Sequence, residues 1–429
     1  MVEGGTVCLR RLARDRVEEM RFGRWLANPK VRLEAMERAL NEQIGPRVAG
    51  LHVLAIQDTS EINCQAHARR TRGLGTVGNG RDKGLFVHPV LAVDAESGAC
   101  LGLVGAQVYA RTKAAEPNYR ELPIESKESM RWLRGALTAR NALGQARHVT
   151  VVADRESDIY EEWDRLPQVG FDLLTRACRD RALADGGRLF TASRPWPVAG
   201  HLDLELPARP GKRGARTATL EVRFGAVTIK RPRHGSDPGA SASVCLRLVE
   251  VREAQAPAGE EPVHWRLLTT HAVEDIEQAL RIVLWYRRRW LIEQLFRTLK
   301  TQGLNIESSQ VESAQALRRL IVLALIAATH ILQLQGVRDG LLFRPLSDVF
   351  TAEQSAVLAA VLPGLEGRTA ARRNPHASHT LAWAAWIIAR LGGWDGYPKS
   401  APPGPITLAN GYARFAVLCE GAALARNLC

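Results

Sequence analysis

A single glutamate stands among basic residues between Tyr286 and Lys300, and these residue types suit a chemical reaction on a charged substrate. The segment 274–300 contains no Gly or Pro, so we expect one continuous helix. At about 3.6 residues per turn, five side chains share one face of that helix: Tyr286, Arg289, Glu293, Arg297 and Lys300. A carboxylate among cations suits a site that holds a metal ion beside a phosphodiester. A solvated basic helix with a chance glutamate is the competing interpretation.

Two aspartates follow apolar segments that are typical of buried strands. Asp58 comes after the segment 51–57, and Asp154 comes directly after the segment 148–153. A lone aspartate at such a place is usually a turn or helix-cap residue. Two of them on strands of one sheet, together with Glu293, form a set of oxygen ligands able to hold two Mg²⁺ ions about 4 Å apart. We therefore expect Mg²⁺ as the cofactor, with Mn²⁺ as a substitute.

The overall charge points to a polyanionic partner. The chain has 58 Lys and Arg against 45 Asp and Glu, a formal net charge of +13, which attracts nucleic acid without reading its sequence. The seven cysteines form no CxxC pair and are typical of reduced thiols, not of a disulfide framework or a zinc site. The apolar run 320–334 is too short to span a bilayer and contains His330. We expect a soluble cytoplasmic protein without a membrane partner.

The elements that must position these residues change in character along the chain. Helical patterns extend to about Gly50, strands then alternate with helices to about Arg176, a β-rich zone follows, and helices dominate from Ala272 onward. In the second zone we expect strands at 51–56, 85–93, 101–109, 148–153 and 171–176, with helices at 126–143 and 158–165. This order predicts an α/β fold with a mixed sheet and helices packed against it.

The β-rich zone carries a second basic feature. We expect its strands at 202–206, 217–224, 227–231 and 244–251. Between Arg209 and Arg233 there are eight Lys or Arg residues and one Glu, which suits a β-ribbon lying along a phosphate backbone. A solvated hairpin has the same pattern. In the last zone we expect helices at 314–334, 352–362, 381–391 and 408–424.

Four of the residues on the basic helix carry a family resemblance. Tyr286, Arg289, Glu293 and Lys300 match a Tyr-x2-Arg-x3-Glu-x6-Lys signature, and the chain resembles the DDE transposases of the bacterial insertion-sequence-four family, the group of the transposon-five transposase. Both aspartate segments are similar to that family's motifs. Further similarity lies at Arg21-Phe22, Asn28-Pro29, Glu125 to Trp132, Trp265 to Thr269 and Ile388 to Gly393.

The resemblance implies a ribonuclease H-like catalytic core interrupted by a β-rich insertion subdomain, with helical regions at both ends. The corresponding domains are a shortened N-terminal DNA-binding region at 1–50, the first part of the core at 51–176, the insertion at 177–271, the last core helices at 272–335, and a C-terminal dimerisation region at 336–429.

The resemblance also implies cut-and-paste transposition: nicking of the transposon ends, hairpin formation and opening, and strand transfer by two-metal chemistry. Asp58, Asp154 and Glu293 would be the catalytic metal ligands. The residues implied to contact DNA are Tyr286, Arg289, Arg297, Lys300, Arg176 and Trp265. The implied partners are terminal inverted repeats, target DNA and a second copy of the chain in a synaptic complex, in the bacterial cytoplasm at the nucleoid.

Several of these roles have plainer alternatives. Trp265 would stack on a flipped base, or it is simply a core residue of its strand. Arg176 would contact a phosphate, or it is a plain surface arginine. The segment 73–78 fits GxGxxG without a preceding strand, so we interpret it as a hairpin loop near the active site. For Asp158 and Glu156, capping of the following helix is the simpler role than metal binding.

Two further functions compete with that of a transposase. Only 20 residues precede Arg21, whereas the resembled enzyme has a longer end-binding domain there. A chain with a shortened N-terminus would inhibit transposition by forming inactive heterodimers. A structure-selective nuclease on the same core would cut DNA without joining it.

Overall fold

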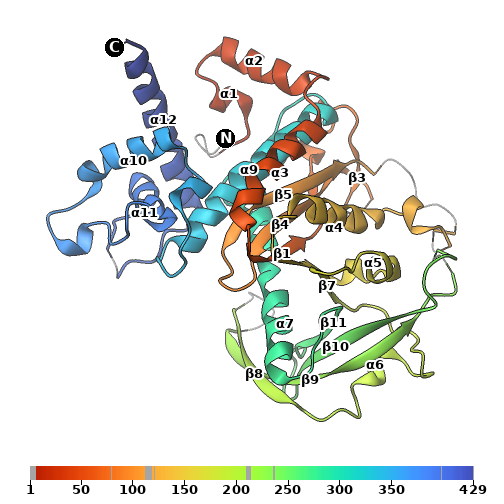
Figure 1. Cartoon of the computed structure of the whole chain (residues 1–429). Coiled ribbons are helices and arrows are strands. Elements are labelled where there is room, and N and C mark those ends of the chain that lie inside the picture. Colours follow the sequence, from red (N-terminus) through yellow and green to blue (C-terminus); the bar gives the residue numbers. More distant parts are fainter. Residues whose placement is uncertain are drawn as a thin grey trace. The chain divides into compact units, whose positions relative to one another are not determined.

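The structure is a computed structural model that describes residues 6–428 apart from positions 79, 112–117, 120, 209–213, 235–236 and 398. Its contacts divide the chain into two compact units. Unit 1 combines Met1–Ala49, Thr59–Lys113 and Leu291–Cys429, and unit 2 combines Gly50–Asp58 and Ala114–Trp290. Each unit is therefore assembled from segments far apart in the sequence (Figure 1).

Unit 2 is built on a mixed sheet. Its first three strands are parallel and are β1 (His52–Gln57), β6 (His148–Ala153) and β7 (Phe171–Arg176). Antiparallel strands continue the order from β7: β11 (His264–Thr269), β10 (Ser243–Glu253), β9 (Arg216–Lys230) and β8 (Gly200–Leu206). Parallel strands are covered on both faces, which explains why β1 and β6 are almost continuously buried. The predicted mixed α/β architecture is confirmed.

Helices of unit 2 pack against this sheet. They are α4 (Met130–Ala142), α5 (Tyr160–Arg165), α6 (Leu189–Ala192) and α7 (Ile276–Arg288). Helix α4 contacts β1 and β6, while α7 contacts β6, β7, β9 and β10. Trp132 of α4 and Tyr160 of α5 are fully buried, so both helices contribute large side chains to the core.

The β-rich zone differs from the prediction at Gly225. We expected two strands separated there, but β9 continues through it and pairs with β10 at Leu248. A Cβ atom on Gly225 would lie 2.7 Å from the Trp196 ring, so this glycine makes room for an indole and does not form a turn.

Three of the five basic residues that the structure describes between Arg209 and Arg233 are paired within the protein. Arg216 pairs with Glu253 and Glu260, Arg223 pairs with Glu221, and Arg231 donates to the carbonyls of Pro238 and Ala240. Residues 209–213 of the predicted ribbon lie outside the described residues. The pairing supports the solvated-hairpin alternative for this segment.

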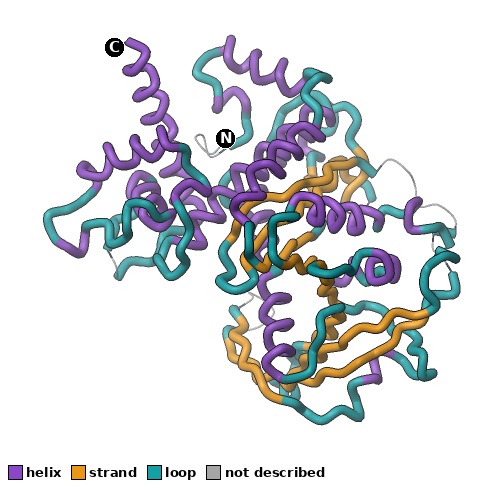
Figure 2. The backbone as a smooth tube through the Cα atoms, viewed as in Figure 1, coloured by secondary structure: helices purple, strands orange, loops and turns teal. Residues whose placement is uncertain are grey.

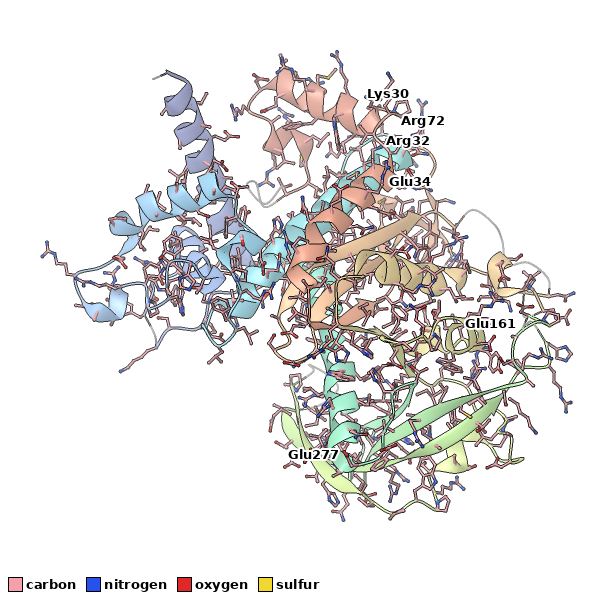
Figure 3. All side chains as sticks on the ribbon, viewed as in Figure 1. Lys30, Arg32, Glu34, Arg72, Glu161 and Glu277 are labelled. Atoms are coloured by element: carbon pink, nitrogen blue, oxygen red, sulfur yellow. The ribbon has the colours of Figure 1, made fainter. Side chains whose placement is uncertain are left out.

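Unit 1 combines a small antiparallel sheet with helices. Strand β4 (Asp82–Asp94) pairs with β2 (Ser60–Asn63), β3 (Gly75–Val77) and β5 (Cys100–Tyr109). The glycine-rich segment thus belongs to the β3–β4 hairpin, as predicted. Helices α1 (Leu9–Leu12), α2 (Arg16–Ala27) and α3 (Leu33–Val48) form the N-terminal part, and α3 packs on β5. Exposed basic side chains of this unit include Lys30, Arg32 and Arg72 (Figure 3).

The rest of unit 1 is a succession of helices joined by loops (Figure 2). They are α8 (Trp290–Lys300, with Trp290 itself in unit 2), α9 (Ala314–Val337), α10 (Ala352–Leu365), α11 (Leu381–Leu391) and α12 (Pro405–Leu428). Helix α9 is long and apolar enough to cross a membrane, but 72% of its apolar window is buried inside the structure. It packs on β5, so it is the core helix that the sequence predicted.

The predicted single helix over 274–300 is wrong. Helix α7 ends at Arg288, and α8 begins at Trp290. At Arg289 the backbone N–H bonds to the carbonyl of Tyr286 at 3.1 Å, three residues back, so the last turn of α7 tightens. Within α8, Glu293, Arg297 and Lys300 still share one face. The buried residues of the helix are Ile292, Leu295, Phe296, Thr298 and Leu299.

Candidate active site

The register of β1 and β6 brings two predicted residues to the same level. His52 pairs with His148 and Ile56 pairs with Val152, and the five pairs keep one constant alignment. Asp58 and Asp154 continue this alignment, each one residue beyond the end of its strand. The carboxyl ends of parallel strands meet at one edge of a sheet, so unit 2 presents two carboxylates there.

Arg289 lies at this edge. Its Nη1 donates to Oδ2 of Asp58 at 2.8 Å, and both side chains are 17% exposed. A guanidinium is therefore held by one of the two aspartates in a partly solvated place. The arginine of the signature and the first aspartate, 231 positions apart in the chain, are thus neighbours.

Asp154 is held by the turn that follows it. Its Oδ1 accepts a hydrogen bond from the N–H of Glu156 at 2.8 Å, so it caps the short 3-10 helix Arg155–Ser157. Glu156 itself is paired with Arg131 of α4. These contacts orient the Asp154 carboxylate without burying it.

A second cluster in unit 2 contains three more predicted residues, the aromatic Trp265 and Tyr286 and the basic Arg176. The rings of Trp265 and Tyr286 meet edge to face with centroids 5.6 Å apart. The Nη2 atom of Arg176 donates to the carbonyl of His264 at 3.0 Å. Burial raises the pKa of Tyr286, while Arg289 and Arg176 act in the opposite direction and Asp154 adds to the rise. The charge of Asp154 therefore acts on the Tyr286 hydroxyl.

Residues 68–329 match a family model described as a transposase DDE domain. The chain belongs to the DDE transposase family. The matched region includes Asp154 and Glu293, and Asp58 lies ten positions before its start. Transposases of this family generally use divalent metal ions. The narrower resemblance to the insertion-sequence-four group remains a prediction.

Among solved structures, this DDE transposase chain is similar to the piggyBac transposase synaptic complex with hairpin DNA, determined by cryo-electron microscopy. The match has 11% sequence identity and a TM-score of 0.34, and it covers 68% of this chain and 48% of that one. The matched part therefore spans about half the length of the piggyBac chain.

The third predicted carboxylate, Glu293, lies in the first turn of α8 in unit 1. On the same face, Arg297 is exposed and Lys300 lies 3.8 Å from Glu307. The predicted residues thus fall into two groups. Asp58, Asp154, Arg176, Trp265, Tyr286 and Arg289 belong to unit 2, and Glu293, Arg297 and Lys300 belong to unit 1.

The predicted capping role of Asp158 is wrong. Helix α5 has Ile159 at its N-cap, without a side-chain hydrogen bond. Asp158 is 1% exposed and accepts from the N–H groups of Cys178 and Arg179, while its other oxygen pairs with Arg181 at 2.6 Å. It joins the loop after β6 to the loop after β7, and this buried ion pair supports the turn that carries Asp154.

Sequence reasoning missed three histidines of unit 2, His52, His148 and His271, whose ring nitrogens lie close together. The available signal was the alignment used for the aspartates. His52 and His148 start the two strands that Asp58 and Asp154 follow. Two histidines at the amino ends of neighbouring parallel strands meet for the same reason as two aspartates at the carboxyl ends.

Proposed function

We propose that this chain is a DNA transposase that cuts and joins phosphodiester bonds, with Asp58, Asp154 and Glu293 as its catalytic carboxylates. The observation that carries the proposal is the common level of Asp58 and Asp154 on adjacent parallel strands, in a chain of the DDE transposase family. Glu293 completes the set by its place in the family signature.

The donor chemistry of the strand-end pair fits a hard divalent cation. Carboxylate oxygens are the ligands that Mg²⁺ takes, and Mn²⁺ accepts the same donors. Asp58 already stabilises one positive charge, the guanidinium of Arg289. When bound, the metal would activate the attacking hydroxyl and stabilise the leaving oxygen. Asp58, Asp154 and Glu293 would hold it.

The neighbouring side chains have roles in binding DNA. Arg289 can exchange its bond with Asp58 for a bond with a phosphate once a cation neutralises that carboxylate. Tyr286 offers a hydroxyl within electrostatic range of Asp154, and Arg176 adds a guanidinium that acts on the same hydroxyl. Trp265 is partly exposed, and its ring meets that of Tyr286 edge to face, which suits stacking on an extruded base. This arrangement supports the cut-and-paste route with a hairpin intermediate.

The partners we propose are double-stranded transposon ends and target DNA. The net charge of +13 supports attraction to phosphates. Unit 1 adds a pocket of about 440 Å³ lined by residues 65–70 and Gln310, with Arg69 and Arg70 in its wall. We further propose a ribonuclease H-like core, a homodimer formed through residues 336–429, and a place at the nucleoid in the bacterial cytoplasm.

The test is strand transfer. Pre-cut duplexes with the element's own inverted repeats are mixed with supercoiled plasmid and Mg²⁺, using wild type, Asp154→Ala and Asp203→Ala. Asp203 is an exposed aspartate of β8 in the same unit and is the matched control. Joined products that disappear only in Asp154→Ala support the proposal.

Other outcomes separate the alternatives. If nicking depends on Asp154 but no joined product forms, the chain is a structure-selective nuclease and not a transposase. If the chain forms dimers, shows neither activity and blocks an active relative in the same assay, it is an inhibitor that acts through heterodimers.

A further inference from the structure

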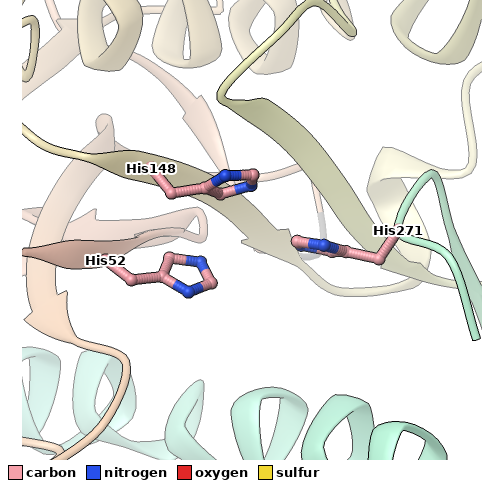
Figure 4. A group of neighbouring side chains, drawn as sticks. All are labelled: His52, His148 and His271. Carbon is pink, nitrogen blue, oxygen red and sulfur yellow. The ribbon is translucent and has the colours of Figure 1, made fainter.

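Three histidines converge at the amino ends of β1 and β6 (Figure 4). His52 is the first residue of β1, His148 is the first residue of β6, and His271 follows the end of β11 by two residues. One ring nitrogen from each lies within 4.8 Å of the other two. Three segments that are far apart in the sequence therefore place imidazoles around one point of unit 2.

Polar neighbours orient the three rings. The hydroxyl of Thr150 lies 2.8 Å from Nε2 of His52 and 2.7 Å from Nε2 of His271. Oδ2 of Asp172 lies 2.8 Å from Nε2 of His148 and 3.5 Å from Nδ1 of His271. Ligand histidines in proteins characteristically bond a carboxylate or another acceptor through the second ring nitrogen. This cluster has that kind of outer shell.

The carboxylate of the cluster is itself fixed. Oδ1 of Asp172 accepts from the hydroxyl of Thr270 at 2.6 Å, which leaves Oδ2 directed at the histidines. The ring of Trp285 packs against His52 and His271, with centroid distances of 4.7 and 5.0 Å. Two neutral hydroxyls, one carboxylate and an indole therefore hold the rings in place.

His148 and His271 are partly exposed, so an ion can reach them.

We propose that His52, His148 and His271 bind one divalent transition-metal ion of the Zn²⁺ class, with Asp172 as an outer partner that orients His148 and His271. Three nitrogens and a solvent molecule in the fourth position suit tetrahedral Zn²⁺, at Zn–N distances of about 2.0–2.1 Å. Ligand nitrogens on such an ion are about 3.3 Å apart, so side-chain rotation must shorten the nitrogen–nitrogen separations, which are at most 4.8 Å, by up to about 1.5 Å. Mg²⁺ prefers oxygen donors and is not the ion for this site.

The ion would have a structural role. Six residues of extended chain separate His52 from Asp58, about 20 Å at roughly 3.3 Å per residue, so the site is remote from the catalytic aspartates. It would tie the starts of β1 and β6 to the segment after β11. The inference does not depend on the proposed transposase activity, because metal binding is measured without DNA.

The experiment titrates metal-free protein with Co²⁺, which replaces Zn²⁺ and gives a visible absorption band in tetrahedral sites. We expect a tetrahedral absorption band that saturates at one Co²⁺ per chain and that is displaced by Zn²⁺ and not by Mg²⁺. His148→Ala and His271→Ala should each weaken binding at least about 100-fold. Asp154→Ala, which removes a catalytic carboxylate, and His201→Ala, which removes an exposed histidine of β8, should bind Co²⁺ as wild type does.

Absence of the band in wild type, or a band unchanged in both His148→Ala and His271→Ala, would overturn the proposal. If those variants do not fold, the proposal is still tested by measurements on the wild-type protein alone. Stoichiometric Zn²⁺ should raise its Tm, and an unchanged Tm together with no retained Zn²⁺ after dialysis contradicts the site. His148→Gln, which keeps a polar side chain, provides a second loss-of-ligand variant.

Discussion

The two ends of strands β1 and β6 carry opposite chemistries on one backbone frame. At the amino ends stand His52 and His148, and just beyond the carboxyl ends stand Asp58 and Asp154. The same parallel register aligns both pairs. One end offers nitrogen donors suited to borderline metals, and the other offers oxygen donors suited to Mg²⁺. Strand pairing decides where ligands meet, and residue type decides what they bind.

The two ends also differ in how the protein supports them. Behind Asp154, the loop and helix that follow are held by buried ionisable groups, the Asp158–Arg181 ion pair and the carboxyl of Glu162. Around the histidines the supports are the hydroxyl of Thr150 and a partly exposed Asp172. We therefore expect that removing one supporting side chain lowers the free energy of unfolding more at the aspartate end than at the histidine end.

The largest effect should separate the two ends by activity. Asp58→Ala removes a proposed metal ligand, and loss of such a ligand leaves charge in the transition state less stabilised, so strand transfer should fall by at least about 10³-fold. The same variant should keep its Co²⁺ absorption, because the histidines are intact. Loss of both properties in a folded variant would contradict the division of chemistry between the ends.

Asp158→Ala should have the largest effect on stability. It leaves the guanidinium of Arg181 buried without its partner, and two backbone N–H groups lose their acceptor. The free energy of unfolding should fall by about 3–5 kcal/mol. Urea denaturation measures this, with Asp203→Ala as an exposed control that changes stability by less than about 0.5 kcal/mol. Equal effects of the two substitutions would contradict the supporting role of Asp158.

Glu162 should make stability depend on pH. Burial raises its pKa to about 8, against the hydrogen bond from Ser157. Between its ordinary value of 4.5 and about 8, the folded protein therefore keeps a proton that the unfolded chain has lost. The stability contribution of this group is complete below pH 4.5 and is lost as the pH rises toward 8.

Glu162→Gln removes that titration and keeps the shape of the side chain. Relative to wild type, the variant should gain roughly 2–4 kcal/mol in unfolding free energy between pH 5 and pH 8. Denaturation curves across this interval measure the difference. Parallel pH profiles for both proteins would show that Glu162 is already ionised in the folded state.

The smallest effect should come from the histidine end. Thr150→Val removes the hydroxyl that bonds His52 and His271, and the metal-free protein should lose about 1–2 kcal/mol. Co²⁺ absorption should remain, because Thr150 is not a proposed ligand. Thr219→Val on β9 deletes a hydroxyl bonded to exposed Asp203 and is the control. Loss of the Co²⁺ band in Thr150→Val would place the hydroxyl among the ligands.

Local patterns predicted the strands well because burial dominates there. The apolar runs of β6 and β7 matched the structure to the residue, and the aspartates after β1 and β6 followed from them. The histidines escaped prediction because they are far apart in the chain, and no short spacing relates them. The strand alignment that relates them is a property of the sheet.

Other misses have the same origin in tertiary contacts. In the sequence, Gly225 resembles a turn residue. In the structure it lies within a strand, because the indole of Trp196 leaves no room for a side chain there. No Gly or Pro in the sequence marks the end of α7 at Arg288. The helix is interrupted at Arg289, whose side chain donates to Asp58. Asp158 resembles a cap until Arg181 is known to lie beside it.

The shared register of β1 and β6 gives the two ends a common evolutionary constraint. Shifting one strand by a single residue turns all its side chains to the opposite face and misaligns both pairs at once. An insertion or deletion inside either strand is therefore penalised twice, whereas a substitution affects only one end. We therefore expect point substitutions of the histidines to be tolerated without loss of the aspartates, whereas the lengths of β1 and β6 should stay constant.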